Sequence, residues 1–118
     1  MTDLVNIEIT DYIAEVRLNR PDKYNALSPE MFQAIIQAGE TVSQNRSIRA
    51  IILTGEGRGF CAGLDFESFM AMGSGQTSEN GEMGRVFLKR SRDGLANYAQ
   101  LTGYIWKKEE VPVIAALH

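Results

Sequence analysis

Alternating apolar positions mark the start of the chain. Val5 to Thr10 and Ile13 to Leu18 are two runs rich in β-branched residues, and Asp11-Tyr12 separates them. Alternation of this kind around a two-residue break predicts a β-hairpin with one solvated face. We therefore expect the chain to open with antiparallel strands.

A polar segment and then a helical stripe follow this hairpin. Residues 19–25 are polar and contain a proline, which favours an exposed loop with a basic centre. Ser28 is a good N-cap, and Pro29 suits the first position of a helix. The apolar residues after it recur at helical spacing and predict a core-facing stripe of Met31, Ile35, Ala38 and Val42.

The middle of the chain alternates between strand and helix patterns. Residues 49–54 are a short apolar run, typical of a buried parallel strand, so the helix before them implies a strand–helix–strand crossover. A glycine-rich turn occupies 55–59, and helical spacing returns over 64–72. Residues 72–84 are rich in Gly, Ser, Gln and Asn and predict a flexible surface excursion.

The last third of the chain predicts one long helix and one strand. Residues 85–108 contain no proline and place most apolar residues on one side, as an amphipathic helix weakened by Gly94 and Gly103 would. Pro112 ends it, and 113–117 have the pattern of a buried strand. An opening hairpin followed by alternating strands and helices indicates the α/β class.

Composition and charge narrow the function classes. The 118 residues are 44% hydrophobic and 23% charged, which is typical of one globular domain. Twelve basic against fifteen acidic residues give a net charge of −3, so no basic excess exists to neutralise a nucleic acid. No apolar run reaches membrane-spanning length and the start lacks a signal-peptide pattern, so we expect a cytoplasmic protein without a membrane partner.

The scarcity of cysteine and histidine excludes two kinds of chemistry. Cys61 is the single cysteine and His118 the single histidine. One thiol cannot form an intrachain disulfide or a multi-thiolate zinc site, so no metal is expected. A histidine at the last position likewise excludes histidine-paired catalysis elsewhere in the chain.

The glycine-rich turn allows three interpretations. Residues 57–62 formally fit the G-x-G-x-x-G/A dinucleotide fingerprint, but the match is weak because Gly55-Glu56 intervene and a hairpin comes first. The turn could also serve only to enter the next helix. If Asp65 caps that helix, however, the exposed amide before it belongs to Leu64 and is a candidate oxyanion donor.

Three stretches in order carry a more specific signal. They are residues 18–27 (LNRPDKYNAL), residues 50–55 running into 60–65 (AIILTG and FCAGLD), and residues 111–118 (VPVIAALH). Together they resemble the enoyl-CoA hydratase/isomerase family, also called the crotonase superfamily, over nearly the whole chain. The resemblance implies a spiral of ββα turns, of which residues 1–118 would be the N-terminal part of a single domain.

The resemblance also implies a function. Family members bind acyl-CoA thioesters without a dissociable cofactor, because coenzyme A is part of the substrate, and they assemble as homotrimers or paired trimers. The motif Ala62-Gly63-Leu64-Asp65 matches the first oxyanion motif, so Leu64 N–H would hold the thioester oxygen. Residues 23–27 match the loop that grips the nucleotide, with Lys23 at a phosphate, Ala26 at adenine through its backbone, and Leu27 at the end of the loop.

Other parts of the family pattern lie outside these residues. The second oxyanion donor is expected directly after His118 and the acid/base carboxylates farther on, so the 118-residue chain alone is expected to be inactive. Glu79 and Glu82 are the carboxylates of the 72–84 excursion that would overhang an acyl pocket. We therefore expect hydration or double-bond isomerisation of an enoyl- or dienoyl-CoA, and the alternative is a non-catalytic fragment or interaction module.

Overall fold

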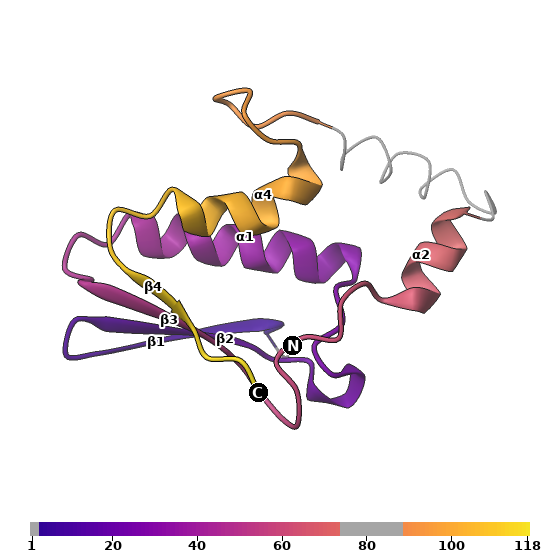
Figure 1. The fold of residues 1–118 in the computed structure, drawn as a ribbon, viewed down its shortest axis with the longest axis horizontal. Helices are drawn as coiled ribbons and strands as arrows, with labels where there is room; N and C mark the ends of the chain where they lie inside the picture. Colours follow the sequence, from indigo (N-terminus) through magenta and orange to yellow (C-terminus); the bar gives the residue numbers. More distant parts are fainter. Residues whose placement is uncertain (1–2, 74–88) are drawn as a thin grey trace.

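A four-stranded sheet with helices on one face forms the frame of the molecule. A computed structural model describes residues 3–73 and 89–118. The strands lie in the order β1-β2-β3-β4, and α1 and α4 lie side by side over the same face (Figure 1). In chain order the elements are β1 (Val5–Thr10), β2 (Ile13–Leu18), η1 (Pro21–Lys23), α1 (Pro29–Ser43), β3 (Ala50–Gly55), α2 (Phe66–Gly73), α4 (Tyr98–Lys107) and β4 (Val113–Ala115).

The predicted hairpin is confirmed. β1 and β2 pair antiparallel from Val5 opposite Leu18 to Thr10 opposite Ile13. Asp11 and Tyr12 both have positive φ, 50° and 68°, which a two-residue turn of type I′ requires at its central positions. The face of β2 that points away from the helices is partly open to solvent, as the alternation predicts, because Ile13 is 42% exposed.

The predicted crossover is confirmed as well. β2 pairs parallel with β3, β3 pairs parallel with β4, and α1 connects the first two of these strands. The Ser28 hydroxyl accepts a hydrogen bond from Met31 N–H and Pro29 begins α1, so this helix starts where its cap residues predict. The predicted stripe on α1 is buried throughout.

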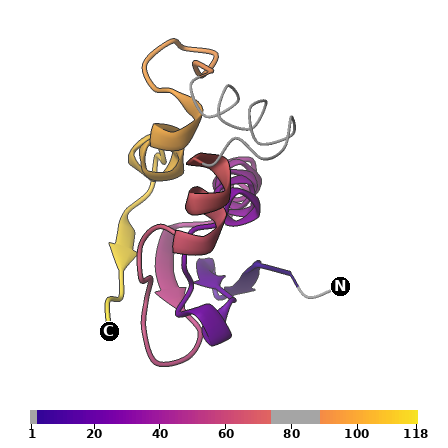
Figure 2. The same ribbon diagram turned by 90° about the vertical axis from the view of Figure 1, so that its right-hand side faces the viewer.

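Two hydrophobic clusters join the sheet to the helices. The larger cluster lies under the C-terminal half of α1 and contains Ala14, Val16, Ala38, Val42, Ile48 and Ile51. The smaller one lies under its N-terminal half and contains Leu18, Met31 and Ile35. Trp106 of α4 packs against both clusters, which fixes α4 over the sheet beside α1 (Figure 2).

The prediction of one helix over 85–108 is wrong for residues 89–97. Gly94 has a φ of 72°, outside the helical region, and the Asp93 carboxylate accepts hydrogen bonds from Ser91 and from Leu95 N–H. These contacts, with an ion pair to Lys108, lower the pKa of Asp93 to about 2. Side-chain bonds to nearby backbone compete with helix here, and α4 begins only after the Asn97 cap.

Three smaller expectations are also corrected. The strand predicted over 113–117 ends at Ala115, and it is not buried: Ile114 is 58% exposed because β4 is the edge strand of the described sheet. The loop over 19–25 is not exposed throughout, since Asn25 is fully buried. The helix predicted from residue 64 begins at Phe66.

The 72–84 excursion lies outside the described residues except for its first two. These two residues end α2, and Glu79 and Glu82 belong to the part that is not described. α2 itself lies near the start of α1, where the rings of Phe32 and Phe69 meet edge to face at 6.3 Å between centroids. This contact positions the turn that precedes α2.

Replacing Gly39 by alanine is expected to destabilise the protein by about 1–3 kcal/mol. A Cβ at Gly39 would lie 2.5 Å from Ile105 Cγ1, so α1 and α4 could not keep their present approach. The matched control is Gly103→Ala in α4, where a Cβ meets no described residue within 4 Å and alanine should add about 0.5–1 kcal/mol of stability as the better helix former. Urea denaturation measures both, and equal effects of the two changes would contradict the close packing.

Candidate active site

A single parallel β-bridge joins the turn after β3 to the loop before α1. Leu27 N–H donates to Gly63 O at 2.7 Å, and Leu27 O accepts from Asp65 N–H at 3.0 Å. In such a bridge the residue between the two bonded positions turns its own N–H away from the partner. Leu64 is that residue, and its N–H has no hydrogen-bond acceptor among residues 3–73 and 89–118.

The surroundings of Leu64 leave room for a ligand. Gly63 has a φ of 96°, which glycine adopts readily, and a Cβ placed on it would meet no atom of residues 3–73 or 89–118 within 4 Å. Asp65 then precedes α2, and its carbonyl accepts a hydrogen bond from Phe69 N–H. The free amide therefore lies at the N-terminal, partly positive end of a helix, where an anionic oxygen is favoured.

The loop before α1 carries the other predicted site residues. Lys23 ends the short helix η1 and its side chain is exposed, whereas Ala26 is 8% exposed and Leu27 is half-buried. Ala26 N–H donates to Lys23 O, and Ala26 O accepts from Ser28 N–H and from Arg20. Adenine contact through the Ala26 backbone stays a prediction, and it would require one of these internal bonds to be exchanged.

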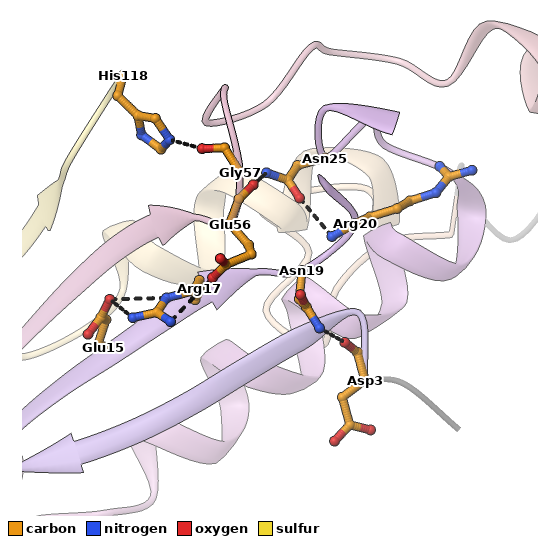
Figure 3. A network of polar contacts seen from close by, with 9 residues as sticks. All are labelled: Asp3, Glu15, Arg17, Asn19, Arg20, Asn25, Glu56, Gly57 and His118. Carbon is orange, nitrogen blue, oxygen red and sulfur yellow. Dashed lines mark hydrogen bonds and ion pairs between the residues drawn. The ribbon is translucent and has the colours of Figure 1, made fainter. Parts of the chain in front are cut away.

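Asn25 holds this loop against the turn. Its side-chain amide donates to Glu56 O at 3.0 Å and its Oδ1 accepts from Arg20 N–H at 2.7 Å (Figure 3). The same amide also donates to Gly59 O at 2.9 Å. Its φ of 56° is one that asparagine tolerates better than most residues. Asn25 therefore satisfies backbone groups from two segments that lie about thirty residues apart in the sequence.

An ion pair joins the same two segments. Both Nη atoms of Arg20 lie 3.3 Å from Asp65 Oδ2, which also accepts a hydrogen bond from the Ser68 hydroxyl at 2.7 Å. The Ser68 bond is the largest cause that lowers the pKa of Asp65; partial burial opposes it, and Arg20 and Lys23 lower the pKa further. The carboxylate is therefore ionised at neutral pH and bonded within the protein.

The C-terminal stretch reaches the same region. His118 Nε2 lies 3.1 Å from Gly57 O (Figure 3). His118 O also accepts a hydrogen bond from Phe60 N–H. On the other side of the turn, Ala62 N–H donates to Tyr24 O at 2.9 Å. The three stretches that carry the family resemblance thus meet around one turn.

An apolar cavity adjoins this turn. It has a volume of about 210 Å³ and lies between the sheet, α1 and α4. Beside the turn, Leu64, Phe66 and Met70 also expose 60%, 74% and 59% of their surface. The buried Thr102 hydroxyl lines the cavity and has no hydrogen-bond partner among the described residues. The cavity is lined by Val16, Leu18, Leu27, Ile35, Leu53, Thr54, Phe60, Cys61, Thr102 and Trp106.

The described part of the chain holds neither a metal-ligand cluster nor a helix of membrane-spanning character. No group of three or more His, Cys, Asp or Glu side chains there is arranged to hold a metal ion. Within the same residues, no helix combines the length and the hydropathy that crossing a bilayer requires.

Comparison with known proteins decides the family. Residues 8–92 match the profile of the enoyl-CoA hydratase/isomerase family. The chain belongs to the enoyl-CoA hydratase/isomerase family. It is 36% identical to an enoyl-CoA hydratase of Mycobacterium tuberculosis over 85% of its own length and 36% of that protein. It is 29% identical to a mitochondrial Δ(3,5)-Δ(2,4)-dienoyl-CoA isomerase of the mouse over 96% of its length and 34% of that protein.

The fold comparison agrees with this family. The crystal structure of a putative enoyl-CoA hydratase from Streptomyces coelicolor superimposes with a TM-score of 0.73 at 32% identity, covering 98% of this chain and 38% of that one. The crotonase-like α/β fold expected from the sequence is therefore confirmed. The chain spans 34% to 38% of the length of these three proteins.

Sequence reasoning missed three side chains that hold the loop before α1, the turn after β3 and the start of α2 together. Arg20 and Ser68 bind the Asp65 carboxylate and Asn25 binds the Glu56 and Gly59 carbonyls, and the sequence predicted a role for none of the three side chains. A weak signal existed for Asn25, because asparagine is enriched at positive φ in tight loops. No local pattern pairs Arg20 with Asp65, 45 residues away.

Proposed function

We propose that this protein binds an acyl-CoA thioester and hydrates or isomerises an enoyl- or dienoyl-CoA through an enolate-like state. The observation that carries the proposal is the Leu64 N–H, which has no acceptor in the described part of the chain and is held outward by the Leu27 bridge. Proton transfer beside a thioester carbonyl develops negative charge on its oxygen. One aimed amide lowers such a barrier by roughly 3–4 kcal/mol.

Different residues would bind different parts of the substrate. Lys23 would meet a CoA phosphate, Ala26 and Leu27 would line the nucleotide end, and Ala62 and Gly63 would let the thioester approach Leu64 N–H. The apolar cavity next to Leu27 would receive the acyl group. In hydration, water oxygen bonds to Cβ and a proton to Cα; in isomerisation, a proton leaves one carbon and another is added elsewhere. The acid/base groups for these steps, and the second donor, are expected after His118.

Binding of a saturated acyl-CoA, measured by calorimetry, tests the proposal. Lys23→Ala is expected to weaken binding about 5–10-fold, since one exposed charge-assisted contact to phosphate is lost, and the loss should shrink at high salt. The matched control is Lys107→Ala, an exposed lysine at the end of α4. Absence of binding by the unaltered protein at millimolar ligand would contradict CoA recognition, whereas equal binding by Lys23→Ala would contradict the phosphate contact alone.

Binding without catalysis is the second candidate function. In this case residues 1–118 would hold the substrate through Leu64 N–H and the loop before α1 without supplying the acid/base groups. Acyl-CoA binding by the 118-residue chain without hydratase or isomerase turnover is the expected result. The trimers or paired trimers implied by the family stay a prediction that analytical ultracentrifugation checks.

A further inference from the structure

The strongest unassigned feature of the site is the ion pair between the nucleotide loop and the oxyanion turn. The side chains of Arg20 and Asp65 are 21% and 12% exposed, so the pair is largely shielded from water. An ion pair in such surroundings is stronger than one on an open surface. Arg20 additionally donates to Ala26 O at 3.1 Å, which ties the guanidinium to the loop at a second point.

Asp65 links the ion pair with Arg20 to the backbone at Leu64, whose N–H is the candidate oxyanion donor. Its N–H lies one peptide beyond the Leu64 amide and is bonded to Leu27 O, while its carboxylate is bonded to Arg20 and Ser68. A shift of the Asp65 backbone would therefore turn the Leu64 N–H. Misplacement of a reacting group by about 1 Å can cost on the order of 10²-fold in rate.

We propose that Arg20 and Asp65 are positioning residues that fix the Leu64 amide against the CoA-binding loop. This inference rests on the proposed function, because it concerns the aim of the same donor. Neither side chain is expected to touch the thioester. The Asp65 carboxylate, which sequence resemblance groups with the substrate-binding residues, acts through Leu64 and not on the substrate.

The test compares Arg20→Gln, Asp65→Asn and the double variant with Asp93→Asn. Asp93 is a matched control because it also accepts a serine hydroxyl and pairs with a basic side chain, but in the separate 91–97 turn. Infrared difference spectroscopy of a bound, carbonyl-labelled acyl-CoA reports how strongly the thioester oxygen is polarised. Steady-state kinetics of the catalytically active protein, carrying the same substitutions, gives kcat and KM.

We expect each single site variant to lose at least half of the carbonyl shift seen in the unaltered protein. Its kcat should fall about 10–100-fold while its KM changes less than about 3-fold. The double variant should match the worse single variant within about 3-fold, since both changes break one interaction. Asp93→Asn should keep the shift and kcat even if it lowers the melting temperature.

The outcomes separate this inference from the proposed function. If the unaltered protein binds acyl-CoA with no carbonyl shift, the oxyanion proposal itself fails. If it shows the shift and the folded variants keep it in full, the positioning role is refuted and the oxyanion proposal stands. Should the neutral variants not fold, Arg20→Lys retains the charge but not the planar fork, and an unchanged shift there refutes the positioning role equally.

Discussion

Replacing Leu64 by proline is expected to lower turnover by about 10²–10³-fold in the active protein, whereas Leu64→Ala should leave most activity. Proline deletes the N–H that would hold the thioester oxygen, and alanine deletes only a side chain that is 60% exposed. The bridge to Leu27 survives both changes, because it uses Gly63 O and Asp65 N–H. The contrast between the two variants therefore isolates the amide.

Steady-state kinetics with an enoyl-CoA measures this contrast, after circular dichroism has shown that the proline variant is folded. Leu64 is not among the residues with positive φ, and its flexible neighbour Gly63 relieves the restriction that proline places on the residue before it. A folded proline variant as active as the alanine variant would refute the oxyanion role. The turn would then serve only as the entry to α2.

Asn25→Ala is expected to lower the free energy of unfolding by about 3–4 kcal/mol. The change leaves Arg20 N–H and two backbone carbonyls, of Glu56 and Gly59, without the partner that now satisfies them. It also places alanine at a φ of 56°, which costs about 1 kcal/mol more. Urea denaturation followed by circular dichroism measures the loss.

Two further variants separate the loss of the hydrogen bonds from the cost of positive φ. Asn25→Gly removes the three hydrogen bonds without the cost of positive φ, so it should lose about 1 kcal/mol less than alanine. Asn19→Ala is the matched control, because Asn19 makes one exposed hydrogen bond to Asp3 O and should cost less than about 1 kcal/mol. Equal losses of stability at Asn19 and Asn25 would show that the Asn25 hydrogen bonds do not hold the loop before α1 against the turn after β3.

Elements whose signals are local were predictable. α1 begins at Ser28 and Pro29 because a cap and a first-position proline act within one turn of the chain, and its buried stripe follows from helical spacing. The hairpin and the crossover follow from strand runs and the segment between them. The positions of the Leu64 motif and of the Lys23 loop came from a resemblance to a family, and local patterning left the glycine turn open between several interpretations.

The 89–97 segment shows where patterning fails. Its apolar spacing continues the helical pattern, yet Asp93 bonds Ser91 and Leu95 N–H, and Gly94 adopts a positive φ. Short polar side chains can form hydrogen bonds with the backbone in place of helical ones, and hydrophobic spacing does not reveal this. Leu95 is 67% exposed as a result, although the spacing assigns it to the buried side.

The sequence by itself determined the order of strands and helices, the start of α1, and, through its three motifs, the family to which the chain belongs. Tertiary structure alone decided that the Leu64 N–H has no acceptor among the described residues, because that depends on which neighbours Leu27 bonds across the bridge. It alone also brought Arg20 to Asp65 and buried Asn25 between two turns. Hydrophobic periodicity records which face of an element is buried, but partners chosen across the fold leave no periodic trace, since any polar residue at the right place could supply them.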